Sequence, residues 1–504
     1  MRAQLVSLLP LLCVSLCVAP GCSDGDGFTV QSNPDAGVAS DAPDNSDGQV
    51  DGTTPDDAGG GEDAAEEGGA DAADDVVTSC APGTADCDGD PANGCEVATE
   101  ANLDHCGSCG TACESGANAA ASCNGGVCGL ACEDGFEDCD DVASNGCEAD
   151  LSSTATCGSC GQVCGDQHAA ATCDAGTCKL TCDDGFADCN GNPSDGCEVE
   201  LAVAAANCGW CGHDCGGATC DQGLCEPTAL ATGQDGAFAL AVDDTNVYFT
   251  AIYAEVVGRV AKAGGSVETL FAGAPRGFIF VDDTHAYISA GVEFSTFLNR
   301  FPKTGPFVET EVVSQFSANR FAFDDERAFW SDASHQQIGS VPKAGGTATT
   351  LATGQVKCFA LAVNTTTVFW GLFDAEEIRA VPKSGGTPFL VVSGAGKPAA
   401  MAADDTHLYW ITPDGVHRAT FAGSSHEILA AVPSGLTSLT IDDANVYFSS
   451  LSDGYVKAVS KNGGEVRTYA TGLSDSFGLA VDDDAVYFTE ASGTQGGAVS
   501  RVSK

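Results

Sequence analysis

A short motif recurs seven times in the C-terminal half of the chain, and this repeat limits the fold more than any other feature. It first reads VDDTNVYF at 242–249, where Asp243 and Asp244 stand side by side between two apolar runs. Later copies begin at residues 281, 323, 363, 403, 441 and 481 and read VDDTHAYI, FDDERAFW, VNTTTVFW, ADDTHLYW, IDDANVYF and VDDDAVYF. Successive copies lie 38 to 42 residues apart, a period that is typical of repeat architectures.

Each unit of this repeat is expected to form four short strands. The paired carboxylates separate an apolar run from an aromatic one, and a Gly-Gly pair follows further on, as in VPKAGG at 341–346. Short Asp side chains bond the local backbone in turns, and Gly-Gly suits two-residue hairpin loops. Four strands about every 40 residues, seven times over, predict an all-β chain with a seven-bladed β-propeller at 226–504.

The repetition also decides how the paired carboxylates are interpreted. An active site is one constellation, whereas Asp243 and Asp244 have counterparts in most units, so we interpret them as turn residues and not as catalytic acids or bases. The last unit lacks a fourth strand, and TALATGQDGAFALAV at 228–242 parallels TTLATGQVKCFALAV at 349–363. An N-terminal strand is therefore expected to complete the last blade and to leave no open sheet edge.

Other repeated residues of the propeller are expected to have structural roles. Three tryptophans share one strand position and are expected to pack between blades: Trp330, Trp370 and Trp410. Cys358 stands in an apolar strand and is expected to be a buried thiol. Five lysines share one blade position and are expected to be solvated turn residues on one rim, although such a rim could instead hold an acidic partner: Lys262, Lys303, Lys343, Lys383 and Lys461.

A second repeat, with a period near 50 residues, precedes the propeller and holds 24 of the 28 cysteines. Each of its three copies has eight cysteines, with NGCE or DGCE at the third and a core such as CGSCG at the fourth and fifth. The copy at 80–128 has Cys80, Cys87, Cys95, Cys106, Cys109, Cys113, Cys123 and Cys128. The copy at 132–178 has Cys132, Cys139, Cys147, Cys157, Cys160, Cys164, Cys173 and Cys178. The copy at 182–225 has Cys182, Cys189, Cys197, Cys208, Cys211, Cys215, Cys220 and Cys225.

An even number of cysteines per copy predicts four disulfides in each module and an oxidising compartment. Zinc is the alternative, because CGSCG and CGWCG contain C-x-x-C pairs, but zinc sites usually use four ligands and not eight. Eight cysteines permit 105 pairings, which the sequence leaves open. The pattern resembles the Cys-rich, EGF-like repeats of myxobacterial envelope proteins. That resemblance implies extracellular spacer or adhesion modules.

One ion site is conceivable inside the first copy. In ADCDGDPANGCE, Asp86, Asp88 and Asp90 alternate at a spacing that can place oxygen ligands around calcium. Pro91 and Val97 stand where an EF-hand loop has Gly and Glu, and polar turn chemistry explains the same residues without an ion. We therefore expect no cofactor, with calcium at this turn as the open alternative.

The N-terminus predicts export. Arg2 precedes the apolar run LVSLLPLLCVSLCVAP, which is too short for a comfortable membrane span and is typical of a signal peptide at 1–22. The run ends in APGC, which resembles the lipobox of bacterial lipoproteins and implies a lipid on Cys22. An ordinary secretory signal is the alternative. Residues 23–79 contain sixteen acidic residues, no basic ones and few large apolar side chains, so they are expected to be a disordered acidic tether.

Charge restricts the partners. A net charge of −52 argues against binding to nucleic acid or to an anionic membrane surface, because both need basic patches. Contact with a membrane is therefore expected only through the lipidated N-terminus, at the cell envelope, in the outer membrane or on the cell surface.

Two known propeller classes share motifs with this repeat. Phe329-Trp330-Ser331-Asp332 resembles the YWTD propellers of the LDL-receptor class, which have six blades and bind protein ligands. Tyr487-Phe488-Thr489-Glu490 resembles the repeats of streptogramin lyase, and this resemblance makes Glu490 the one weak candidate for a catalytic residue.

The expected function is non-catalytic binding or adhesion, with the propeller as a scaffold for a protein or glycan whose identity the sequence leaves unknown. One alternative is a metal-dependent lyase or hydrolase acting at the propeller channel. The other is a structural spacer of the envelope.

Overall fold

The computed structural model describes residues 79–504, except 91, 274, 293–294, 305–307, 317, 333, 422–425, 433–434 and 492–495. The predicted signal peptide, Cys22 and the predicted tether up to residue 78 lie outside the described residues. All regular secondary structure in the described part is β-strand. Within that part, no helix has the length and apolar character needed to span a bilayer. The chain divides into two compact units, with described parts 79–198 and 199–504.

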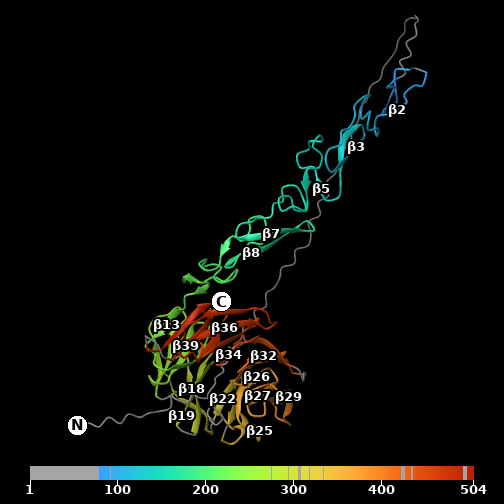
Figure 1. Ribbon diagram of the computed structural model, residues 1–504. Coiled ribbons are helices and arrows are strands. Elements are labelled where there is room, and N and C mark those ends of the chain that lie inside the picture. The colour runs from blue at the N-terminus through green and yellow to red at the C-terminus, as the bar shows by residue number, and fades with distance from the viewer. Residues whose placement is uncertain are drawn as a thin grey trace, which may run out of the picture. The chain divides into compact units, whose positions relative to one another are not determined.

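The second unit contains seven four-stranded antiparallel sheets, which are the blades of a propeller (Figure 1). Blade 1 is formed by β14 (Ala237–Val242), β15 (Asn246–Ala251), β16 (Val256–Ala261) and β17 (Glu268–Ala272). Blade 2 is formed by β18 (Pro275–Val281), β19 (His285–Val292), β20 (Ser295–Pro302) and β21 (Thr310–Phe316). Blade 3 is formed by β22 (Ala318–Phe323), β23 (Arg327–Asp332), β24 (Gln337–Pro342) and β25 (Thr349–Thr353).

The other blades repeat this order of inner, second, third and outer strand. Blade 4 is formed by β26 (Cys358–Val363), β27 (Thr367–Leu372), β28 (Glu377–Pro382) and β29 (Phe389–Ser393). Blade 5 is formed by β30 (Ala400–Ala403), β31 (His407–Thr412), β32 (Gly415–Thr420) and β33 (Glu427–Ala431). Blade 6 is formed by β34 (Leu436–Ile441), β35 (Asn445–Ser450), β36 (Tyr455–Ser460) and β37 (Val466–Ala470).

Blade 7 joins the two ends of the propeller. Its inner three strands, β38 (Leu479–Val481), β39 (Ala485–Glu490) and β40 (Ala498–Ser503), come from the end of the chain, and its outer strand β13 (Thr228–Thr232) precedes blade 1. The pairing places Thr228 opposite Arg501 and Thr232 opposite Ala498. The inner strand β14 of blade 1 also contacts β38. The ring is therefore closed by an N-terminal strand, as the sequence predicts.

The blades bury their second strands almost completely, because each sheet packs between two others. In β15, Tyr248 and Phe249 are both fully buried, and the tryptophans of β23, β27 and β31 are buried as predicted: Trp330, Trp370 and Trp410. Trp330 faces a glycine on the third strand, whereas Trp370 faces Arg379 and Trp410 faces His417. A Cβ atom on Gly339 would lie 2.4 Å from the Trp330 ring, so glycine is required there.

The Cys-rich repeats consist of short strands and turns held by disulfides. Their strands are β1 (Thr84–Ala85), β2 (Val97–Ala98), β3 (Ala119–Asn124), β4 (Val127–Cys132), β5 (Phe136–Glu137), β6 (Ala149–Asp150), β7 (Ala169–Asp174), β8 (Thr177–Cys182), β9 (Phe186–Ala187), β10 (Val199–Glu200), β11 (Cys220–Asp221) and β12 (Leu224–Cys225). The first and second copies each form β-hairpins, β3–β4 and β7–β8.

One disulfide order is repeated, which the sequence left open among 105 pairings. In the first two copies the first cysteine pairs with the third, the second with the fifth, the fourth with the seventh and the sixth with the eighth: Cys80–Cys95, Cys87–Cys109, Cys106–Cys123, Cys113–Cys128, Cys132–Cys147, Cys139–Cys160, Cys157–Cys173 and Cys164–Cys178. The third copy has the same first-to-third, fourth-to-seventh and sixth-to-eighth bonds: Cys182–Cys197, Cys208–Cys220 and Cys215–Cys225. Its other two cysteines, Cys189 and Cys211, are also disulfide-bonded.

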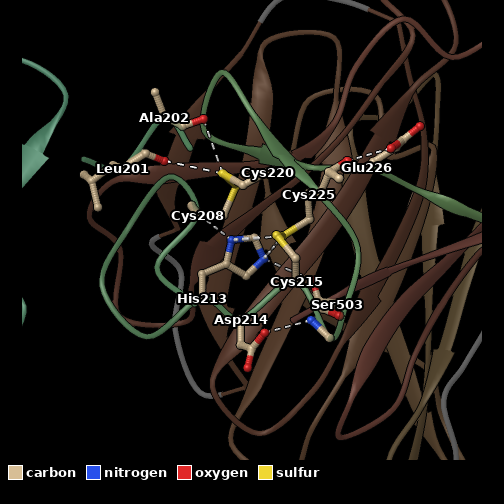
Figure 2. Close-up of a disulfide and its surroundings, with 12 residues drawn as sticks. Leu201, Ala202, Cys208, His213, Asp214, Cys215, Cys220, Cys225, Glu226 and Ser503 are labelled. Carbon is tan, nitrogen blue, oxygen red and sulfur yellow. Dashed lines mark hydrogen bonds between the residues drawn. A yellow bond between two sulfur atoms is a disulfide. The ribbon is translucent and has the colours of Figure 1, made fainter. Parts of the chain in front are cut away.

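The last part of the third copy belongs to the propeller unit. Trp210 and His213 stack with ring centroids 3.8 Å apart, and both rings meet the edge of Tyr469 in β37. His213 is buried between Cys208 and the last strand, with its Nε2 atom 3.2 Å from the Ser503 carbonyl oxygen (Figure 2). Gly216 also lies against that strand, where a Cβ atom would meet Ser503 Oγ at 2.7 Å. Cysteines and blades 6 and 7 thus share one core.

Candidate functional site

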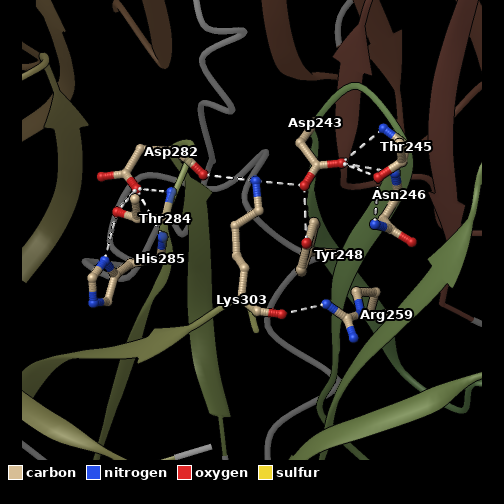
Figure 3. A network of polar contacts seen from close by, with 9 residues as sticks. All are labelled: Asp243, Thr245, Asn246, Tyr248, Arg259, Asp282, Thr284, His285 and Lys303. Carbon is tan, nitrogen blue, oxygen red and sulfur yellow. Dashed lines mark hydrogen bonds and ion pairs between the residues drawn. The ribbon is translucent and has the colours of Figure 1, made fainter. Parts of the chain in front are cut away.

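The paired carboxylates of the repeat organise a polar network between neighbouring blades. Asp243 Oδ1 accepts hydrogen bonds from the backbone N–H groups of Thr245 and Asn246, at 2.9 and 2.8 Å. Its Oδ2 atom accepts a 2.9 Å hydrogen bond from the Tyr248 hydroxyl and lies 2.6 Å from Lys303 Nζ of blade 2 (Figure 3). One carboxylate therefore closes its own turn, fixes the tyrosine of its own blade and binds the lysine of the next blade.

The same pairing links blades around the ring. In each case a lysine directly after the third strand meets the first Asp of the preceding blade: Lys262–Asp482, Lys303–Asp243, Lys343–Asp282, Lys383–Asp324, Lys461–Asp404 and Lys504–Asp442, at distances of 2.5 to 2.9 Å. The prediction that these lysines are solvated turn residues is wrong, because their side chains are only 10–19% exposed and are bound to carboxylates. The interpretation of the paired Asp residues as turn residues is confirmed.

The interface between blades 4 and 5 has an apolar contact in place of the ion pair, beside a 2.8 Å hydrogen bond from the Thr365 hydroxyl to Asp405. Asn364 stands at the Asp position of blade 4, and Phe421 stands at the lysine position of blade 5. Phe421 stacks on Phe369, which occupies the tyrosine position, with ring centroids 4.9 Å apart. The carboxylate and the lysine are thus absent together at this interface, so neither leaves the other's charge partly buried without its partner.

Five carboxylates of the network have lowered pKa values. Burial acts to raise the pKa of Asp243, but Lys303, the backbone N–H groups of Thr245 and Asn246 and the Tyr248 hydroxyl outweigh it and lower the pKa to about 2. Burial and the neighbouring Asp243 charge raise the pKa of Tyr248 to about 12. Burial is likewise outweighed by lysine and backbone contacts, which lower the pKa of Asp282, Asp404, Asp442 and Asp482. A carboxylate so acidic is a poor general base.

Acid should weaken the propeller through these carboxylates. Their pKa values are lower in the folded than in the unfolded chain, so their stabilisation is complete above about pH 4 and is lost as the pH falls toward 2. Asp243→Asn should lower the free energy of unfolding at pH 7 by about 1 kcal/mol, since the pair is partly exposed and screened. Urea unfolding at pH 7 and pH 3 should show this difference shrinking in acid. Asp244→Asn removes the same charge from the same turn and should change stability little.

The predicted catalytic candidate lies at the end of a second strand. Glu490 ends β39, and its Oε2 atom accepts a 3.3 Å hydrogen bond from the backbone N–H of Ser474. Asp332 ends the corresponding strand of blade 3, and Thr412 ends that of blade 5. Glu490 is therefore one member of a variable position of the repeat. A catalytic role for it stays a prediction.

Two Asp–His pairs were missed by the sequence reasoning. Asp332 is buried, and its carboxylate accepts hydrogen bonds from the backbone N–H of His335, at 2.9 Å, and from its Nδ1 atom, at 2.8 Å. Asp414 lies 3.3 Å from Nε2 of His417. Both histidines follow their carboxylate by three residues, a local spacing that could have indicated the pairs. The His335 ring is exposed, and its contact with the buried Asp332 carboxylate closes a turn at the surface.

The carboxylates of the predicted calcium turn bind the local backbone. Asp86, Asp88 and Asp90 each accept a hydrogen bond from a backbone N–H two or three residues ahead, at 2.8 to 2.9 Å. The hydrogen bond from the Asp90 N–H, followed by one from the Asn93 side chain, lowers the pKa of Asp88. Both oxygens of Asp88 thus accept hydrogen bonds within the turn, and calcium binding there stays a prediction.

The cysteine clusters do not offer zinc ligands. Cys106, Cys113 and Cys128 bring their sulfur atoms together, as do Cys157, Cys164 and Cys178. These sulfur atoms are in disulfides and are not thiolates. In the propeller, Cys358 is a buried thiol whose pKa is raised to about 12, mainly by burial, as expected of an inert core cysteine.

Comparisons with known proteins find similar solved structures only. No protein-family model matches the chain, and no curated protein matches it. The virginiamycin B lyase from Staphylococcus aureus is 12% identical, with a TM-score of 0.46, over 55% of this chain and 98% of that chain. A streptogramin B lyase is 12% identical, with a TM-score of 0.45, over 55% and 96%. The WD40 propeller domain of Doa1 is 11% identical, with a TM-score of 0.44, over 55% and 97%.

Proposed function

We propose that the protein is an exported, lipid-anchored surface protein that binds a partner protein through blades 4 and 5 of its propeller. The many disulfides indicate an exported protein, because such bonds persist in oxidising compartments. The APGC sequence ending at Cys22 supports the anchor. A propeller scaffold is suited to binding, and the repeated charges of the ring are engaged in holding blades together.

One observation carries the choice of surface. Large apolar side chains are exposed on the outer strands of two adjacent blades: Phe389 and Leu390 of β29, and Ile428 of β33, at 44 to 51% exposure. Leu390 and Ile428 occupy one register position, paired with Arg379 and His417. At that position the other blades have small or polar residues: Ala229, Thr269, Glu311, Thr350 and Thr468. The apolar surface is therefore a property of these blades and not of the repeat.

Exposed aliphatic side chains favour a protein over a glycan as the partner. Burying a whole Leu or Ile side chain stabilises by about 1.5–3 kcal/mol, so burying these half-exposed residues contributes about 1 kcal/mol each. Glycans offer mostly hydroxyl groups, which gain less from aliphatic contacts. Clustered apolar residues on a surface mark protein interfaces in many soluble proteins.

The proposal is tested with full-length protein immobilised and exposed to surface proteins of the source cell. Leu390→Glu with Ile428→Glu should weaken retention of the partner more than tenfold. Thr269→Glu with Thr350→Glu places the same charges at the same register position in blades 1 and 3. This control variant should retain the partner as the unmodified protein does. Equal retention of the partner by both double variants would exclude the apolar residues of blades 4 and 5 as the binding surface. In the same cells, Cys22→Ser should move the protein from the membrane fraction to the soluble fraction.

A further inference from the structure

Blade 5 contains a cluster of two imidazoles and an indole that the rest of the ring does not repeat. His417 lies on β32, and His426 immediately precedes β33. The His417 ring stacks against Trp410 of β31 with centroids 5.4 Å apart. The His426 ring lies 5.4 Å from His417 and 5.5 Å from Trp410, centroid to centroid. Side chains from β31, from β32 and from the residue before β33 thus meet at one place.

Hydrogen bonds fix which nitrogen of His417 carries the proton. Nε2 lies 2.8 Å from Thr412 Oγ1 and 3.3 Å from Asp414 Oδ1. The Thr412 hydroxyl donates its proton to Asp414 Oδ1. A lone pair of Thr412 Oγ1 therefore accepts the hydrogen bond from His417 Nε2. The acceptors at Nε2 therefore require a proton on that nitrogen. Nδ1 is left with its lone pair.

That lone pair has nothing to accept in the described structure. His417 is 3% exposed, and Nδ1 is buried with no hydrogen-bond partner among the described residues. A buried polar atom without a partner costs about 1–3 kcal/mol, so native proteins seldom leave one unpaired. Burial lowers the pKa of His417. The neighbouring Asp414 acts to raise it and His426 acts to lower it, and the net effect is a lowered pKa. The buried lone pair of Nδ1 is therefore available to a metal ion.

We propose that His417 Nδ1 and the His426 imidazole bind one divalent transition-metal ion of the Zn²⁺, Cu²⁺ or Ni²⁺ class. Two imidazoles that share an ion at nitrogen–metal distances of about 2.0–2.1 Å have ring centroids roughly 5 Å apart, which fits the separation of 5.4 Å. Asp414 and Thr412 hold the opposite nitrogen of His417, the outer-shell arrangement typical of metal-binding histidines. Water completes the coordination, because the cluster supplies two protein ligands.

The ligand chemistry selects the class of ion. Imidazole suits zinc, copper and nickel, whereas magnesium and calcium prefer oxygen ligands. The blade architecture does not require these histidines, since the register position of His417 is occupied elsewhere by Gly258, Asn299, Gly339, Arg379, Lys457 and Ser500. The cluster is thus specific to blade 5. This inference is independent of the proposed binding function.

Titration of the full-length protein with Cu²⁺ tests the site through the fluorescence of Trp410. A copper ion bound by both imidazoles lies close to that indole and should quench its emission, and Trp410→Phe should remove the quenching. Zn²⁺ should raise the melting temperature by several degrees at concentrations far above its dissociation constant, whereas Mg²⁺ should not. His426→Ala, at a half-buried position, should fold normally and weaken metal binding at least tenfold.

The control is His335→Ala, which removes the exposed histidine of the Asp332 pair and should leave the quenching and the melting shift unchanged. Quenching that persists in His426→Ala and disappears in His335→Ala would place the metal at Asp332 and overturn the proposal. Absence of both quenching and a melting shift in the unmodified protein would also overturn it. His417→Ala should abolish binding, and any loss of fold in that variant is judged against His426→Ala.

Discussion

Leu230→Asp will open the propeller between its first and last blades. Leu230 is 4% exposed in β13, the strand that completes blade 7, and its side chain belongs to the core shared by blades 1 and 7. A carboxylate at this position would be buried without a partner, at a cost of about 4 kcal/mol or more. Without β13, the third strand β40 becomes an exposed edge.

Urea unfolding of the full-length protein measures this effect. The Leu230→Asp variant should lose most of the stability of the propeller and become sensitive to protease. Thr232→Asp introduces the same charge at an exposed position of the same strand and should unfold like the unmodified protein. If both variants unfolded at the same urea concentration, β13 would contribute little to closure, and the ring would be held by its inner strands alone.

Cys157→Ser with Cys173→Ser will unfold the second Cys-rich repeat and spare the propeller. This disulfide spans 16 residues, and Cys157 is fully buried in a core that consists largely of cysteine side chains. Removing a disulfide that closes a loop of that length should lower the free energy of unfolding of the repeat by about 3 kcal/mol, from the chain entropy of the unfolded state alone. A module with so small an apolar core has little else to hold it.

Limited proteolysis with mass analysis distinguishes the two units. New cleavage sites should be confined to residues near 132–178, while the melting temperature of the propeller stays unchanged. Ala155→Ser, an exposed change in the same repeat, serves as the control. Resistance of the double variant to protease would mean that the other disulfides suffice. A fall in the melting temperature of the propeller would mean that its stability depends on this repeat.

Much of the fold can be predicted from the sequence, because the motifs that mark turns and strands are local and repeat in most blades. Asp243 and its counterparts mark one turn per blade, and the aromatic five residues later marks the second strand. The resemblance between 228–242 and 349–363 indicates the strand that closes the ring, because an outer strand and the following inner strand recur together. Such features need no knowledge of distant contacts.

The contacts between blades could not be read in the same way. Lys303 and Asp243 are 60 residues apart, and nothing local states that a lysine of one blade faces the carboxylate of the preceding one. A signal existed in the coincidence of Asn364 with Phe421, since the carboxylate and the lysine are lost at the same interface. The packing of His213 against Ser503 had no signal, because those residues belong to different repeats. Disulfide order likewise depends on module geometry.

The histidine sites show a similar limit. His417 stands in an apolar strand without a motif, and only its spacing from Asp414 could have drawn attention to it. The proximity of His426 depends on how β32 and β33 pair in blade 5, with His417 opposite Ile428. A register shift in this pair determines which side chains meet. That shift has no reliable local marker in sequence.

The central claim is that seven blades are closed into a ring by β13, and a disulfide trap tests it most directly. Thr232 and Ala498 pair across β13 and β40, at a separation that antiparallel partners share with disulfide-linked residues. Thr232→Cys with Ala498→Cys should form a cross-link that peptide mapping identifies between the two ends of the propeller. Thr232→Cys with Gln337→Cys, which uses the equivalent position of blade 3, should form none. A cross-link in the second variant, or none in the first, would contradict the closed ring.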